Sequence, residues 1–208
     1  MTPAPDKRAL FVVRGGGGRD SAHGPADAEL VARALGGDRA AEEAIYRRYA
    51  GYVTSLCLRL LRDRDELADV VQDTFVDVLQ QLPELREPEL LRRWITGVAV
   101  HKVHRRFRRR RLRLLLGLHR SSHDALVSLH ARADSSPELR TELALLDAQL
   151  ARLPDVERAA WILRYVEDYR LADVAQLCNC SLATAKRRIA AADASIRARV
   201  QLDEVADD

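Results

Sequence analysis

The stretch from residue 171 to 188 constrains this chain more than any other, because its pattern is typical of a helix-turn-helix. A short helix with an apolar face is predicted over Leu171–Leu177, and Ala175 is small where a second helix must pack closely. Asn179 lies where the turn needs a left-handed backbone conformation, which Asn tolerates. Ser181 can then cap the next helix by accepting backbone N–H bonds.

The second helix of this motif carries the side chains that we expect to contact DNA. In helix-turn-helix proteins the first turns of this helix enter the major groove. Phosphate contacts usually outnumber base contacts, so we expect one or two of these side chains to reach base edges. Within residues 171–190 the candidates are Thr184, Lys186, Arg187 and Arg188.

Helical periodicity runs along most of the chain without any strand pattern, which predicts an all-α fold. The clearest period covers residues 63–82, where Asp63 and Glu66 are placed for a capping box and Pro83 marks the end. Its apolar stripe includes Leu79 and Leu82. Further helices are expected over about residues 26–35, 39–61, 89–111, 138–153, 155–166 and 182–200.

Breaks in the helical pattern predict two helical domains joined by a flexible linker. Residues 1–26 contain four consecutive glycines and several prolines, which favours a flexible tail. The first domain is expected over residues 27–111, the linker over 112–137, the second domain over 138–203 and an acidic tail over 204–208.

Charge is unevenly distributed along the chain, although the formal net charge is only +3. Residues 62–89 hold nine acidic and three basic side chains, whereas residues 102–113 hold eight basic ones and no acid. This asymmetry indicates two different macromolecular partners, one of them a polyanion. Three cysteines do not make a disulfide framework, and no apolar run approaches the roughly 20 residues that span a bilayer. We therefore expect a cytoplasmic protein without direct membrane insertion.

No pattern of catalytic or cofactor-binding residues is found, so the chain is predicted not to be an enzyme and to hold no cofactor or metal. The glycine run lacks the Lys-Ser/Thr pair of a phosphate-binding loop. His101 with His104, and Cys178 with Cys180, lack a second pair at zinc-site spacing. The two cysteines are expected to fill apolar sites of the turn, with a redox role as the alternative.

Four stretches in order resemble the extracytoplasmic-function (ECF) group of bacterial sigma factors, over about residues 27–111 and 138–202. Residues 65–75 are similar to the polymerase-binding helix of that family, and Trp94-Ile95 with the helix up to the arginine run at 108–111 resembles its melting and −10 helix. Leu153-Pro154 with residues 163–167 resembles the entry to its second domain, and the helix-turn-helix follows.

The resemblance implies a transcription initiation factor whose partners are core RNA polymerase and promoter DNA, with an anti-sigma factor as a further partner. Docking on the largest polymerase subunit is implied for Asp69, Gln72 and Asp73, and residues 153–165 are expected near the second-largest subunit. The resemblance also implies that the helix-turn-helix side chains contact the −35 element. Contact with the −10 element is implied for His101, Lys102, Arg105, Arg106, Arg108 and Arg109.

Some positions depart from the family pattern, and some interpretations stay open. His101 stands where the family often has Asn, Arg105 where it often has Asp, and Asp193 where a basic residue is common. The acidic helix face can alternatively be read as a solvated surface, and Trp94 either stacks on bases or anchors the core. The rival functions are a helix-turn-helix regulator without polymerase docking and a structural nucleic-acid-binding protein.

Overall fold

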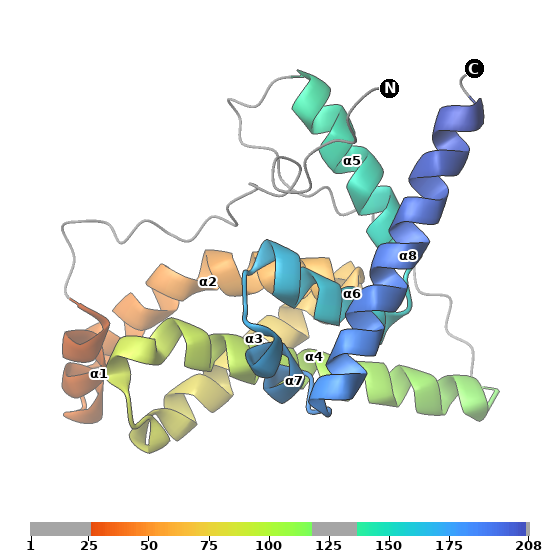
Figure 1. Cartoon of the computed structure of the whole chain (residues 1–208). Coiled ribbons are helices and arrows are strands. Elements are labelled where there is room, and N and C mark those ends of the chain that lie inside the picture. The colour runs from red at the N-terminus through yellow and green to blue at the C-terminus, as the bar shows by residue number, and fades with distance from the viewer. Residues whose placement is uncertain (1–25, 118–136, 207–208) are drawn as a thin grey trace. The chain divides into compact units, whose positions relative to one another are not determined.

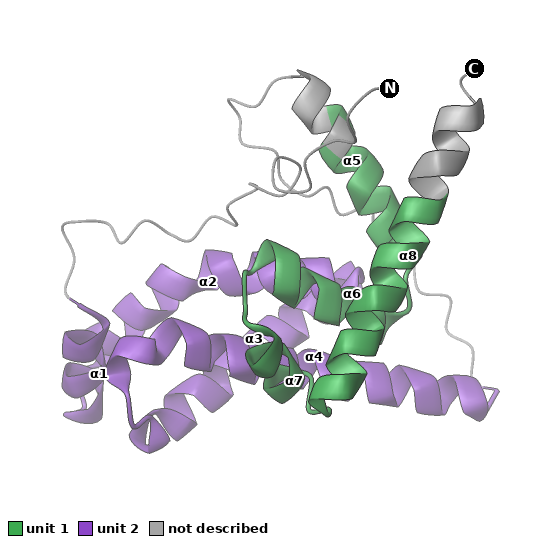
Figure 2. Ribbon diagram, in the orientation of Figure 1, with its two compact units in different colours: residues 1–19, 128–208 green, residues 20–127 purple. Residues whose placement is uncertain are grey.

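The computed structural model describes residues 26–117 and 137–206 of the chain (Figure 1). All regular secondary structure in these two ranges is helical, which confirms the predicted all-α class. The two ranges fall in different compact units, coloured separately in Figure 2. The predicted N-terminal tail lies outside the described residues except for Ala26, and so does most of the predicted linker.

The N-terminal unit, purple in Figure 2, contains four α-helices and two short 3₁₀ segments among its described residues. Their bounds are α1 Asp27–Leu35, α2 Arg39–Leu61, α3 Arg64–Gln81, η1 Leu82–Glu84, η2 Pro88–Leu90 and α4 Leu91–Leu115. Helices α2, α3 and α4 contact one another, and α1 packs on α2. Fully buried aliphatic side chains from all four helices form the core, among them Leu30, Ile45, Leu56, Val70, Val78, Ile95 and Val103.

Two aspartates fix where the long helices of this unit begin. The Asp38 carboxylate accepts the backbone N–H of Ala40 at 2.9 Å, at the start of α2. Asp63 does the same for Asp65 at 2.9 Å and Glu66 at 3.3 Å, at the start of α3. The N-cap at Asp63 confirms the sequence prediction. At both positions the carboxylate satisfies N–H groups that have no partner inside the helix.

Helix α4 continues beyond its predicted end at residue 111, so the predicted start of the linker at residue 112 is corrected. The helix ends at Leu115, and the Leu116 N–H donates to the Leu112 carbonyl at 3.1 Å. Leu and Arg are good helix formers, and nothing interrupts the helix before Gly117, whose φ of 69° suits glycine.

The C-terminal unit, green in Figure 2, contains α5 Pro137–Ala151, α6 Asp155–Trp161, the π-helical segment η3 Ile162–Val166, α7 Leu171–Leu177 and α8 Leu182–Ala206. Trp161, Leu163 and Val174 are buried together with Ala185 and Ala192 of α8. Helix α8 includes the first three residues of the predicted acidic tail, because neither Gly nor Pro follows Leu182.

None of the helices in the described ranges combines the length and the apolar character that crossing a membrane requires.

Candidate functional site

The turn between α7 and α8 has the geometry that the sequence predicts. Asn179 adopts the left-handed conformation with φ 47°, and its N–H donates to the Gln176 carbonyl at 3.0 Å. The Cys180 N–H reaches back to the Ala175 carbonyl at 2.9 Å, which closes the end of α7. Ala175 is buried, and α7 packs on α8. A helix-turn-helix is therefore present.

Ser181 caps the start of α8 through hydrogen bonds to Thr184, one of the predicted DNA contacts. Its hydroxyl oxygen accepts the Thr184 N–H at 3.2 Å and lies 2.9 Å from the Thr184 hydroxyl. Lys186 and Arg187 follow as exposed side chains on the first two turns, whereas Thr184 and Arg188 are half-buried. Lys186 and Arg187 are thus the predicted contacts most open to a duplex.

Asp193, which stands where a basic residue is common in the family, accepts hydrogen bonds from two aromatic side chains. The Trp161 indole N–H donates to Asp193 Oδ1 at 2.8 Å, and the Tyr165 hydroxyl donates to Oδ2 at 3.2 Å. Burial, followed by the Asp193 charge, raises the pKa of Tyr165 above its ordinary value. Asp193 thus joins α6 and η3 to α8, and no local sequence pattern predicts these hydrogen bonds.

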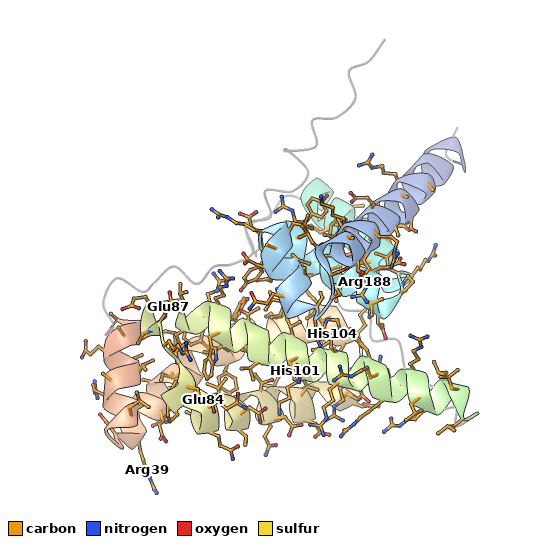
Figure 3. The ribbon with its side chains drawn as sticks, turned by 60° about the horizontal axis from the view of Figure 1, so that its bottom comes forward. Arg39, Glu84, Glu87, His101, His104 and Arg188 are labelled. Atoms are coloured by element: carbon orange, nitrogen blue, oxygen red, sulfur yellow. The ribbon has the colours of Figure 1, made fainter. Side chains whose placement is uncertain are left out.

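One face of α4 is exposed and basic. His101, Arg105, Arg108 and Arg109 are exposed at spacings of i, i+4, i+7 and i+8, and Figure 3 labels His101 and His104 on this helix. None of these four forms an ion pair with any residue that the structure describes. We call them the basic face of α4.

A second stripe of α4 cations lies against α3 instead. Lys102 Nζ lies 2.5 Å from Asp77, the Arg106 guanidinium lies 3.6 Å from Asp73, and the Arg110 guanidinium lies 2.6 Å from Asp63. Arg110 also approaches Glu66 at 3.3 Å. We call these pairs the charged seam. Lys102 and Arg106, both predicted as −10 contacts, are thus ion-paired with α3 in the structure.

The three predicted docking residues lie on one exposed face of α3, which we call the docking face. Asp69, Gln72 and Asp73 are all exposed. The face continues through Val76, 45% exposed, and Leu79, 36% exposed. Val76 was not among the predicted docking residues, and the prediction that Leu79 lies in the buried stripe is wrong. Val76 follows Gln72 by four residues and Asp73 by three, and this helical spacing could have identified it as part of the same face.

Trp94 is half-buried, between the two alternatives drawn from the sequence. Cys178 is buried in the turn as expected, whereas Cys180 is only partly buried. Burial raises the pKa of the Cys178 thiol to about 12, and the neighbouring Cys180 adds to this. The thiolate is the reactive form of cysteine, so Cys178 is a poor nucleophile at neutral pH.

Family comparisons agree with this architecture. Residues 45–113 match the model of Sigma-70 region 2, and residues 143–192 match that of Sigma-70, region 4. The first match contains the docking face and the basic face of α4, and the second contains the helix-turn-helix. Together the fold and these two matches define a DNA-binding initiation factor built from two sigma modules.

Related proteins narrow this class. The ECF RNA polymerase sigma factor SigM of Mycobacterium tuberculosis H37Rv is 28% identical over 88% of this chain and 87% of its own. The RNA polymerase sigma-H factor of Pseudomonas aeruginosa is 29% identical over 86% of this chain and 92% of its own. The chain belongs to the ECF group of RNA polymerase sigma factors, which act in transcription initiation and are not themselves enzymes.

Two solved structures share the fold. CnrH in complex with the cytosolic domain of CnrY has a TM-score of 0.56 at 23% identity, covering 86% of this chain and 99% of that one. The sigma factor RpoE in complex with the anti-sigma factor NepR from Bartonella quintana has a TM-score of 0.60 at 19% identity, covering 77% and 97%.

Proposed function

We propose that this sigma factor binds core RNA polymerase through the docking face of α3. The observation that carries the proposal is the presentation of Asp69, Gln72 and Asp73 together, on the exposed side of a helix whose other side is buried. Carboxylates on such a face form charge-assisted, often bidentate hydrogen bonds with arginines. Val76 and Leu79 add apolar area of the kind found at the centre of interfaces. The partner is the coiled coil of the largest subunit.

The basic face of α4 binds the melted −10 strand in this proposal. A single strand needs a basic track for its phosphates and flat or apolar side chains for its bases. Arg105, Arg108 and Arg109 supply the track, and His101 supplies a ring at one end of it. Lys102 and Arg106 contribute less directly, because the charged seam holds them against α3.

The helix-turn-helix binds the −35 element through the first turns of α8. Lys186 and Arg187 make the main contacts, while Thr184 and Arg188 support them from half-buried positions. The chain between α4 and α5 connects the two modules across the polymerase, and residues 153–165 lie near the second-largest subunit. Modest affinities of two linked modules combine through their effective concentration, so promoter binding is strong only when both are engaged.

The protein acts in the cytoplasm, and an anti-sigma partner regulates it. The support for such a partner is that CnrH and RpoE, which share this fold, were both solved in complexes with other proteins.

Charge reversal on the docking face tests the central proposal. The double substitution Asp69→Lys and Asp73→Lys should abolish co-purification with core polymerase and run-off transcription, while circular dichroism stays unchanged. The matched control is Glu87→Lys with Glu89→Lys, which reverses two exposed charges in and beside η2, a segment that packs on α1 and α4.

The rival functions give different results in the same assay. A helix-turn-helix regulator without polymerase docking, or a structural nucleic-acid-binding protein, would support no run-off transcription even as wild type. Retained co-purification of the charge-reversed protein would show that the docking surface lies elsewhere.

A further inference from the structure

We infer that Asp73 couples polymerase docking to DNA binding through its ion pair with Arg106. In the free protein Asp73 holds the Arg106 guanidinium. When a cation of the polymerase engages Asp73, Arg106 is released and becomes an additional phosphate contact. This inference rests on the proposed function, because it assigns a regulatory step to the docking face.

Asp73 is the one residue that the docking face and the charged seam share among the described residues. It lies on the exposed side of α3 with Asp69 and Gln72, yet its Oδ2 lies 3.6 Å from the Arg106 guanidinium of α4. A ligand that binds the docking face therefore meets a carboxylate that is already paired.

Among the carboxylates of the charged seam, Asp73 is also the one most able to exchange its partner for another cation. The Asp73 side chain is 56% exposed, whereas that of Asp77, which pairs with Lys102 at 2.5 Å, is 28% exposed. The carboxylates that hold Arg110 are more enclosed still. A polymerase cation can therefore reach Asp73 without first separating the two helices.

Arg106 is placed to use its release. It lies three residues before Arg109, and residues at this spacing are neighbours on a helix surface. Its side chain is only 17% exposed while Asp73 holds it. Once it is released, a short swing of its long side chain brings the guanidinium to the edge of the basic face of α4.

The coupling should be modest and reciprocal. An ion pair at 3.6 Å whose carboxylate is largely exposed contributes little free energy, equivalent to about a two- to fivefold change in an equilibrium constant. Two sites linked through one pair must affect each other's affinity by the same factor. Loss of the pair should therefore strengthen DNA binding by the free protein to this extent.

The test compares Asp73→Asn with Asp69→Asn in the full chain without polymerase. Both variants remove one carboxylate from the docking face and change the net charge equally, but only Asp73 pairs with Arg106 in the structure. The probe is a short fluorescein-labelled single-stranded DNA of mixed sequence, and the measurement is fluorescence anisotropy at low salt. Asp73→Asn should bind the probe about two- to fivefold more tightly than Asp69→Asn does.

Repeating both substitutions in a protein that lacks Arg106 tests whether the effect requires the ion pair. With Arg106→Gln as background, Asp73→Asn should no longer strengthen DNA binding beyond the effect of Asp69→Asn. If Asp73→Asn and Asp69→Asn affect DNA binding equally in the wild-type background, the coupling is overturned. Core-polymerase binding by the same two variants is measured separately, and unchanged binding there would overturn the docking proposal instead.

Discussion

The two helices that we propose to bind nucleic acid, α4 and α8, hold their cations in different ways. On α4, three cations each lie within 4.0 Å of a carboxylate of α3: Lys102, Arg106 and Arg110. On α8, Lys186 and Arg187 are exposed, and the helix is held through hydrogen bonds to Asp193 from Trp161 and Tyr165. A helix packed on an acidic neighbour thus uses part of its charge for packing, whereas a helix held through aromatic side chains keeps its cations for a ligand.

The largest expected effect follows from the open cations of α8. Lys186→Ala combined with Arg187→Ala should reduce −35-dependent transcription by about tenfold to a hundredfold. The reason is that a good base-edge contact contributes about 1–3 kcal/mol of discrimination. The measurement is run-off transcription on templates that differ only in the −35 element.

Arg197→Ala is the matched control for this pair, because it removes an exposed arginine from a later turn of the same helix. Its guanidinium lies 4.0 Å from Asp193, and an exposed pair at this distance contributes little to stability. The control should therefore change transcription little. If the control and the double variant lose the same activity, α8 contributes general charge and does not read the −35 element.

A smaller effect is expected where α8 is held in place. Asp193→Ala should lower the free energy of unfolding by about 1–3 kcal/mol, because two partly buried donors lose their acceptor. Asp193→Asn keeps one acceptor oxygen and should lose less. Urea unfolding followed by tryptophan fluorescence provides the measurement, and equal stability of all three proteins would remove Asp193 from this role.

The difference between the basic face of α4 and the charged seam predicts an effect on promoter binding that is of similar or smaller size. Arg105→Gln, on the basic face, should weaken promoter binding by polymerase holding this sigma factor several-fold. It should also lower the slope of log affinity against log salt by about 0.7, the value for one single-strand phosphate contact. Lys102→Gln should leave this slope unchanged, since Lys102 is held by Asp77 at 2.5 Å. Equal changes in slope would show that the charged seam opens when DNA binds.

The sequence predicts well whatever depends on residues close together in the chain. The cap at Asp63 and the turn at Asn179 each depend on a few neighbouring positions, so the local sequence pattern identifies them. The division of the α4 cations does not follow from α4 alone, because it depends on which side faces α3. The family resemblance therefore implied six −10 contacts without saying which of them face α3, whereas the structure separates the exposed cations from those paired with α3.

The docking face shows the same limit. The helical period correctly separated Asp69, Gln72 and Asp73 from the buried residues of α3. It assigned Leu79 to the core, because periodicity identifies an apolar stripe but not how far a neighbouring helix covers it. Asp193 was recognised as unusual, but its hydrogen bonds reach residues that precede it by 28 and 32 positions.

The smallest expected effect concerns the buried cysteine thiols, which are alike in the two units. Each unit has one buried cysteine, and burial raises the pKa of both Cys57 and Cys178 to about 12 from the ordinary value of 9.0. In the unfolded chain these thiols ionise near the ordinary value. The stability that their burial contributes is therefore fully present below about pH 9 and is lost as the pH rises toward 12.

Cys178→Ala should remove this dependence from the C-terminal unit only. At about pH 10 the ionised unfolded state costs the wild type roughly 1 kcal/mol of stability per buried thiol, whereas at pH 7 the cost is absent. The difference in unfolding free energy between wild type and variant should thus shrink by about that amount from pH 7 to pH 10. The matched substitution Cys57→Ala should behave alike in the N-terminal unit, because burial and not ion pairing sets both values. A difference that stays constant with pH in either unit would mean that water reaches that thiol in the folded protein.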